Sequence, residues 1–509
     1  MLPRVCCLAL ALLMATAVPA RAADTRVADA ARNRDAGVVT ALVAGGAGVN
    51  EPQPDGATAL HWAAHWDDLA VADLLLSAGA APAVTNEYGV MPLYLAATNG
   101  SDPMVTRLLE AGADPNAALP TGETVLMAAA RTGKTDAVSA LLSRGADPNA
   151  KQSSKGQTAL MWAISEQHLD TVRLLLDRGA DLSTRTESGF TSLMFATREP
   201  SLAVVTLLVE RGAGVNEWAE DGSTPLLVAT VRGHVEIARY LLDSGARPDG
   251  NLEKAGYSPL HYASGRFDGV ITYDYPDAPG EWQALAGIPS RAGKLDLIRA
   301  LVAKGANLEA KLARDLPRYG YFLYGIGRGD IMVGGTPFYV SALVADVETM
   351  KLLLSLGAKT DVATNSGCTP MMAAAGLGYQ DQESSIPQSA YVDATKFMLG
   401  LGVDVNATND QDFTPMHAAA WAGFEQVIQA LVDKGAAINP KNHRSEMPLD
   451  ITEGYHYTVF YFDRPEAAAL LKKLGGEGGV ERGGFLDGQT KEELEEQRKS
   501  IPLGALPDL

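Results

Sequence analysis

The eight histidines are the residues with which this chain could most readily bind a metal ion or transfer protons. Three of them, His61, His261 and His417, follow a Thr/Ser-x pair at the start of an expected helix. The others are scattered, and none has the HExxH spacing that holds a zinc ion. No GxSxG or paired-carboxylate pattern of a hydrolase occurs. The sequence therefore predicts no metal site, no cofactor and no catalytic centre.

Cysteine offers one further candidate for chemistry. Cys6 and Cys7 lie in the expected leader, so Cys368 alone remains beyond it and no internal disulfide is expected. Cys368 directly follows Gly367, where we expect it to be at least partly exposed. It could serve as a partner-linking or redox-sensitive thiol, or be an inert small side chain. No cationic neighbour in the sequence favours the reactive thiolate.

A period of 33 or 34 residues organises the rest of the chain. A glycine precedes each expected helix start, at Gly56, Gly89, Gly122, Gly156, Gly189, Gly222 and Gly256, and again at Gly334 and Gly367, with Asp412 and Ser445 in the last two units. Most are followed by a capping Thr or Ser and then small alanines, as in TALHWAA (58–64). A leucine-rich segment with helical spacing completes the unit. A single unit cannot bury its apolar face, so the repeat predicts stacked two-helix units.

This motif and period closely resemble the ankyrin-repeat family. The resemblance implies an all-α solenoid of about eleven helix-turn-helix units over residues 23–475. Successive units are joined by finger turns, the loops that carry the aligned glycine, and we call the place of that glycine the finger position. The resemblance also implies that His61, His261 and His417 are buried braces between units. The period is broken by three insertions, near residues 266–291, 312–333 and 379–390. The first two are rich in aromatic residues, which either bind a ligand or pack back onto the solenoid.

The two ends of the chain differ from the repeats. Residues 1–22 have the charged, apolar and small-residue parts of a signal peptide, so we expect export to the periplasm, or secretion as the alternative. Their loss removes Arg4 and Arg21 and takes the net charge from −19 to −21, which disfavours nucleic acid as a partner. No membrane insertion is expected after cleavage, and the chain is expected to be monomeric. Residues 476–509 form a glycine-rich linker and a charged tail.

The resemblance also implies which residues meet a partner. In ankyrin repeats, partners contact the finger turns and the exposed side of the first helix. Carried over to this sequence, and joined by three rings of the second insertion, those positions give His65, Trp66, Tyr88, Phe190, Trp218, Tyr257, Tyr321, Phe322, Tyr324, Phe413 and Trp421. Aromatic residues are enriched at binding hot spots.

Three functions follow from these observations. The leading hypothesis is a non-enzymatic scaffold that binds a protein partner through a concave face and the aromatic loops. The resemblance to exported ankyrin proteins suggests an accessory role to an envelope enzyme. The first alternative is a glycan- or small-ligand-binding protein that uses the Tyr/Trp loops as stacking platforms. The second is an enzyme with its site in the insertions.

Overall fold

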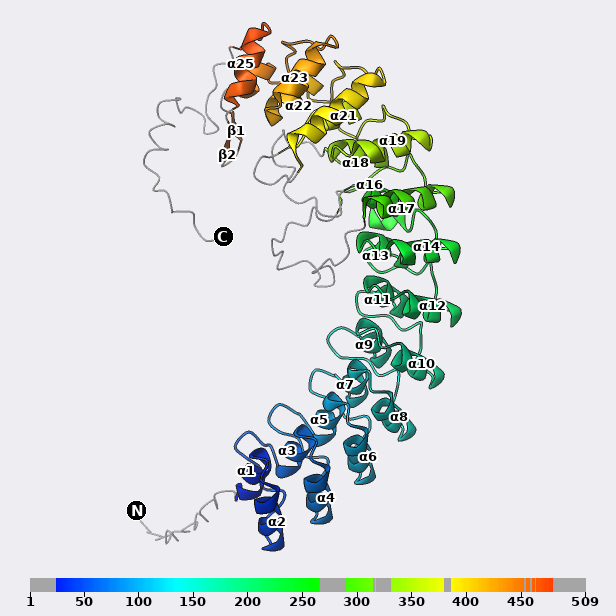
Figure 1. Cartoon of the computed structure of the whole chain (residues 1–509), viewed down its shortest axis with the longest axis vertical. Helices are drawn as coiled ribbons and strands as arrows, with labels where there is room; N and C mark the ends of the chain where they lie inside the picture. The colour runs from blue at the N-terminus through cyan, green and yellow to red at the C-terminus, as the bar shows by residue number, and fades with distance from the viewer. Residues whose placement is uncertain are drawn as a thin grey trace, which may run out of the picture. The chain divides into compact units, whose positions relative to one another are not determined.

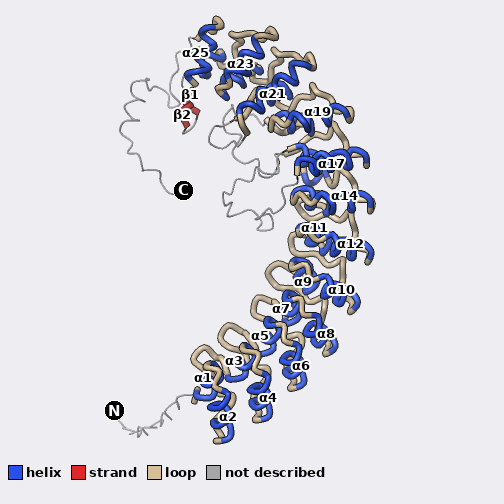
Figure 2. The backbone as a smooth tube through the Cα atoms, in the orientation of Figure 1, coloured by secondary structure: helices blue, strands red, loops and turns tan. Residues whose placement is uncertain are grey.

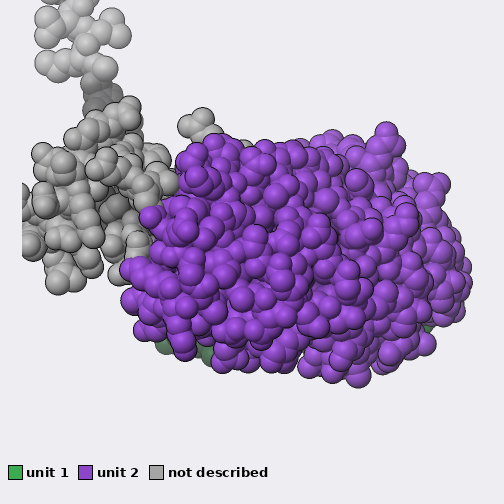
Figure 3. Space-filling model, turned by 90° about the horizontal axis from the view of Figure 1, so that it is seen from above, with its two compact units in different colours: residues 1–181 green, residues 182–509 purple. Residues whose placement is uncertain are grey.

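The computed structural model describes residues 24–265, 290–314, 316, 331–379, 386–452, 455–457, 460–462 and 464–478. The chain divides into two compact units, residues 1–181 and 182–509, which are coloured separately in Figure 3. Each unit is a stack of helix pairs joined by short loops (Figure 2). The expected signal peptide, the rings of the second insertion and the tail beyond residue 478 lie outside the described residues.

The first unit contains five helix pairs in two layers (Figure 1). The first helices, α1, α3, α5, α7 and α9, each contact the next one along the stack, and so do the second helices. The first helices are α1 (Arg26–Arg32), α3 (Ala59–His65), α5 (Pro92–Asn99), α7 (Val125–Thr132) and α9 (Ala159–Ser165). The second helices are α2 (Ala36–Ala44), α4 (Leu69–Ser77), α6 (Asp102–Glu110), α8 (Thr135–Ser143) and α10 (Leu169–Asp177).

The second unit continues the same pattern with longer connections. Its first helices are α11 (Ser192–Arg198), α13 (Pro225–Val231), α16 (Pro259–Ser264), α18 (Pro337–Leu343), α20 (Pro370–Ala374), α22 (Pro415–Ala422) and α24 (Pro448–Thr452). Their partners are α12 (Leu202–Glu210), α14 (Val235–Asp243), α17 (Arg291–Ala303), α19 (Val347–Ser355), α21 (Gln388–Gly400), α23 (Glu425–Val432) and α25 (Pro465–Lys473), with α15 (Leu252–Ala255) in a finger. Two short antiparallel strands, β1 (Tyr455–Tyr457) and β2 (Phe460–Phe462), lie between α24 and α25.

Local sequence explains where the helices begin and how closely the fingers approach. Thr124 has an extended backbone and its hydroxyl accepts the Met127 backbone N–H at 3.2 Å, which caps α7. At Gly222, φ is +89° and a Cβ atom would lie 2.3 Å from the backbone nitrogen of Ala255 in the next finger. Glycine is therefore required there both for its left-handed conformation and for the space.

The histidines that the sequence assigned to bracing are braces. The Nδ1 of His61 accepts the Thr58 backbone N–H at 3.1 Å, and its Nε2 donates to the Val90 carbonyl of the next unit at 3.0 Å. His261 and His417 repeat this pattern, and burial lowers the pKa of each to about 4. These neutral rings therefore tie each unit to its neighbour, as predicted.

Two inserted segments precede unusually long helices. α17 and α21 each contain 13 residues, whereas α4 contains nine. Residues 266–289 and 380–385, which lead into these helices, are outside the described part of the chain. The additional residues lie at the N-terminus of each helix. Each of these two helices therefore begins about one turn earlier than the second helix of a regular unit.

Candidate binding surface

The structure separates the predicted partner-contacting residues into three groups. Tyr88, Trp218 and Trp66 expose 72%, 46% and 39% of their surface, and His65 is also exposed. Four other aromatic residues are buried: Phe190, Tyr257, Phe413 and Trp421. The remaining three, Tyr321, Phe322 and Tyr324, lie outside the described residues.

The expectation of exposure is wrong for Phe190, Tyr257 and Phe413, which all directly follow the finger position. Their side chains turn into the stack: Phe190 packs edge-on against Phe195, with ring centroids 6.1 Å apart, and Phe413 stacks on His417 at 4.8 Å. Cys368 occupies the same register and is also fully buried, so the expectation that its thiol is partly exposed is wrong as well. Side chains at this position face inward because the chain passes from the finger back into the helix layer there.

Trp421 is buried for a different reason. Its indole Nε1 donates to the Tyr379 carbonyl at 3.2 Å, so the segment that follows α20 covers it. The Arg464 Nε in turn donates to the Trp421 carbonyl at 3.2 Å from the following unit. In this part of the second unit, inter-unit contacts occupy the surface that the sequence assigned to a partner.

Around His65 and Trp66, by contrast, the structure gathers aromatic and cationic side chains that are exposed, apart from the half-buried Trp62. The indoles of Trp62 and Trp66 stack with centroids 6.5 Å apart, and the His65 ring lies 4.5 Å from Trp66. The guanidinium of Arg32 lies over the Trp62 ring and that of Arg34 over the Trp66 ring, each at 5.4 Å. We call these five residues the first Arg–Trp platform.

Hydrogen bonds between neighbouring units hold the first Arg–Trp platform in place. The Trp66 Nε1 donates to the Arg32 carbonyl at 3.1 Å, and the Trp62 Nε1 donates to the Gln53 side-chain oxygen at 2.7 Å. From the next unit, the Asn99 amide donates to the His65 carbonyl at 2.9 Å. Rigid rings and anchored indoles lose little conformational entropy when they bind a partner.

Sequence reasoning did not include Trp62, Arg32 or Arg34 among the partner-contacting residues. The available signal was the register. Arg32 is the last residue of the first helix of one unit, and Trp62 is the fourth residue of the first helix of the next. Stacked first helices bring these positions together, because α1 contacts α3.

A second pair of the same kind lies further along the first unit. The Arg131 guanidinium lies over the Trp162 ring at 5.2 Å. Arg131 also lies 4.0 Å from the Glu123 carboxylate, which accepts the Tyr94 hydroxyl at 2.8 Å. Burial and this bond to Glu123 raise the pKa of Tyr94 to about 12, so the phenol stays protonated. We call Arg131 and Trp162 the second Arg–Trp platform.

Two exposed rings lie on finger loops. Tyr88 is at the finger tip before α5. In the second unit, the Lys254 ammonium lies over the Trp218 ring at 4.4 Å, while the Arg185 guanidinium donates to the Trp218 carbonyl at 2.9 Å. These contacts orient Trp218 but leave nearly half of it accessible.

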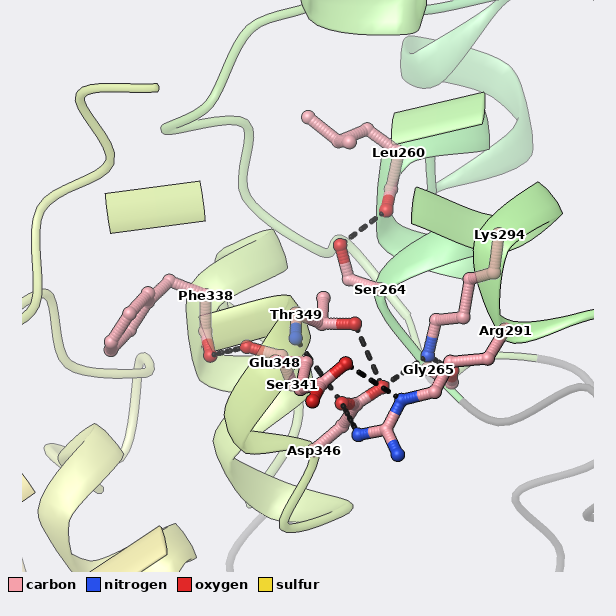
Figure 4. Close-up of polar contacts among 10 residues, drawn as sticks. All are labelled: Leu260, Ser264, Gly265, Arg291, Lys294, Phe338, Ser341, Asp346, Glu348 and Thr349. Atoms are coloured by element: carbon pink, nitrogen blue, oxygen red, sulfur yellow. Dashed lines mark hydrogen bonds and ion pairs between the residues drawn. The ribbon is translucent and has the colours of Figure 1, made fainter. Parts of the chain in front are cut away.

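A largely buried ion pair lies beside Gly265, the last described residue before the first insertion (Figure 4). The Lys294 ammonium donates to the Asp346 carboxylate at 2.8 Å and to the Gly265 carbonyl at 2.5 Å. The Thr349 hydroxyl also donates to Asp346 at 2.7 Å, and Arg291 lies 3.8 Å from it. Burial alone raises the pKa of Asp346, but Lys294 and Thr349 outweigh it and the net pKa is lowered. This cluster joins α16, α17 and α19 and is a structural clamp.

Within the described ranges, no three His, Cys, Asp or Glu side chains are grouped so as to hold a metal ion. No helix among the same residues has the length and apolar character needed to cross a bilayer. The aromatic and guanidinium groups of the two platforms are of the kinds that are enriched at protein interfaces.

The comparisons with known proteins agree with this architecture. A family profile described as "Ankyrin repeats (3 copies)" matches residues 27–118, 93–186, 126–221 and 193–272, and one described as "Ankyrin repeats (many copies)" matches residues 385–432. No curated protein matches the chain significantly.

Among solved structures, the chain is similar to the ankyrin repeat domain of Bcl-3, described as a unique member of the IkappaB protein family. The two are 31% identical with a TM-score of 0.38, and the match covers 42% of this chain and 98% of that one. The profiles together match more than half of the chain, over residues that fold as stacked helix pairs. This chain therefore belongs to the ankyrin-repeat family.

Proposed function

We propose that this protein is a non-enzymatic scaffold that binds a protein partner through the first helices of its repeats. The observation that carries the proposal is the first Arg–Trp platform, where the exposed indole of Trp66 and the half-buried indole of Trp62 lie beside two exposed guanidinium groups. Tryptophan and arginine dominate the binding energy of protein interfaces because each buries a large area. Ankyrin repeats are generally binding modules, and no enzyme family matches the chain.

The platform favours a protein partner over a sugar. A sugar ring stacks on the open face of an indole, but a guanidinium covers one face of both Trp62 and Trp66. A protein surface can instead use the ring edges and the guanidinium N–H groups together. An enzyme site in the insertions would involve residues outside the described part of the chain, and we do not propose one.

The proposed location is the periplasm, on the strength of the signal-like residues 1–22. Cleavage after Ala22 would give a mature chain that starts at Ala23. Cell fractionation and N-terminal sequencing of the recovered protein test this directly. Recovery of an uncleaved chain from the cytoplasm would refute the proposed location without affecting the binding proposal.

Capture of partners from a periplasmic extract tests the binding proposal. We expect the wild-type chain to retain a specific protein that Trp66→Ala loses. Tyr240→Ala, which removes a half-buried ring from a second helix, is the matched control and should retain it. Circular dichroism establishes that both variants keep the fold. Equal recovery by wild type and Trp66→Ala would contradict the proposal.

A further inference from the structure

The two Arg–Trp platforms are the same device, repeated at the same register of the first unit. In each, the arginine lies in the last two residues of one first helix and the tryptophan is the fourth residue of the next first helix. The guanidinium-to-ring distances are 5.4 Å for Arg32 and Trp62 and 5.2 Å for Arg131 and Trp162. The two platforms are three repeats apart, and both lie within residues 1–181.

Packing of the first helices sets the distance between the platforms. Each of α1, α3, α5, α7 and α9 contacts the next, so Trp62 on α3 and Trp162 on α9 are separated by three helix-to-helix steps. Packed helices have axes about 8–10 Å apart, so the platforms are about 25–30 Å apart. They share one layer of one compact unit and can contact the same ligand.

The chemistry of each platform suits a carboxylate. A guanidinium that lies over an indole keeps the N–H groups along its own edges, and these can donate to a carboxylate in a two-pronged bond. The nearby acids already have partners: Asp29 accepts hydrogen bonds from Gln53 and Thr25, and Glu123 accepts one from Tyr94. Glu123 forms a long ion pair with Arg131 at 4.0 Å, so a ligand carboxylate at the second platform must compete with it, which a shorter two-pronged bond can do.

We propose that the two Arg–Trp platforms bind two acidic positions of one elongated polypeptide segment that runs across the first helices of the first unit. This rests on the proposed scaffold function and adds the chemistry and the length of its partner. A span of about 25–30 Å corresponds to roughly eight or nine extended residues, or to about 18–20 residues of α-helix. Binding at both platforms makes the second contact intramolecular, which raises the overall affinity.

Synthetic peptides test this with the full-length mature chain. The probe is a fluorescent 16-residue peptide with a pair of glutamates at each end and a Gly/Ser spacer, long enough to span about 30 Å. Its control carries all four glutamates at one end. Fluorescence anisotropy should give at least about tenfold tighter binding for the two-ended peptide.

Matched variants assign that gain to the platforms. Arg32→Gln and Arg131→Gln should each lower the affinity for the two-ended peptide to the affinity for the one-ended control. Arg173→Gln removes an exposed guanidinium from α10, in the second-helix layer, and should leave the gain intact. Equal affinities for the two peptides, or an equal loss in Arg173→Gln, would overturn the proposal. Tighter, arginine-dependent binding of inorganic polyphosphate than of either peptide would also overturn it, in favour of a phosphate polymer.

The result separates this inference from the scaffold function. If the peptides do not discriminate but partner capture still requires Trp66, the scaffold function stands and the elongated acidic ligand is wrong. If partner capture is also independent of Trp66, both proposals are wrong.

Discussion

Replacing Lys294 by Met tests whether the clamp holds the second unit together where its first insertion begins. The Lys294 and Asp346 side chains are only 10% and 19% exposed, so the change leaves a largely buried carboxylate without its main cation. Breaking a fully buried ion pair costs about 3–5 kcal/mol. Residual exposure and the Arg291 guanidinium, 3.8 Å from Asp346, reduce this. We expect about 2–3 kcal/mol of local destabilisation.

The assay must report local stability, because repeat arrays need not unfold in one step. Native-state hydrogen exchange of the α17 and α19 amides measures it, with urea unfolding as a second readout. Lys304→Met is the matched control, since Lys304 forms an exposed ion pair with Asp243 at 2.8 Å, and it should exchange like wild type. Asp346→Asn added to Lys294→Met should recover part of the loss by removing the unpaired charge.

Equal exchange in Lys294→Met and Lys304→Met would refute the clamp. The pH dependence gives an independent check. The lowered pKa of Asp346 means that its stabilisation is present above the ordinary carboxyl pKa and is lost as the pH falls through the folded value. Protection of α19 in wild type should therefore approach that of Lys294→Met in acid.

Three further predictions follow from buried groups. His261 and His417 have a pKa lowered to about 4, so their bracing is complete above the ordinary histidine pKa of 6.5 and weakens as the pH falls from there toward 4. Urea titration at several pH values should show this loss, about 3 kcal/mol for each ring. His261→Gln should remove about half of it, because His417 remains, and an unchanged pH dependence would contradict the assignment. Gly222→Ala should cost about 2–4 kcal/mol by thermal unfolding, against about 1 kcal/mol for Gly212→Ala, which shares the positive φ but has open space around it. Cys368 should react with a thiol reagent only after denaturation, and rapid labelling of the native chain would show that its burial is wrong.

Much of the fold could be predicted from the sequence because each unit repeats its own local rules. The finger glycine, the capping Thr or Ser and the bracing histidine depend on bonds within a few residues or to the adjacent unit. Their roles at His61, His261 and His417 were therefore predictable. The short strands Tyr455–Tyr457 and Phe460–Phe462 lie between α24 and α25, at a longer connection that was not among the three predicted insertions, and the repeat carries no information about them.

The binding surface was predicted less well, for a physical reason. Whether a ring is exposed depends on what the neighbouring unit places over it, and the repeat register alone does not state this. Phe190 and Phe413 turn into the stack, and Trp421 is covered by the segment after α20. His65 and Trp66 remain exposed.

By itself, the sequence determined the architecture: a 33- or 34-residue period whose units must stack to bury their apolar faces. Tertiary structure alone decided the side-chain contacts between units. Arg32 meets Trp62 from the preceding unit, and Lys294 meets Asp346 across an insertion, 52 residues along the chain. Such contacts depend on side-chain direction and on which surfaces adjacent units cover. These quantities arise only when the helices are packed.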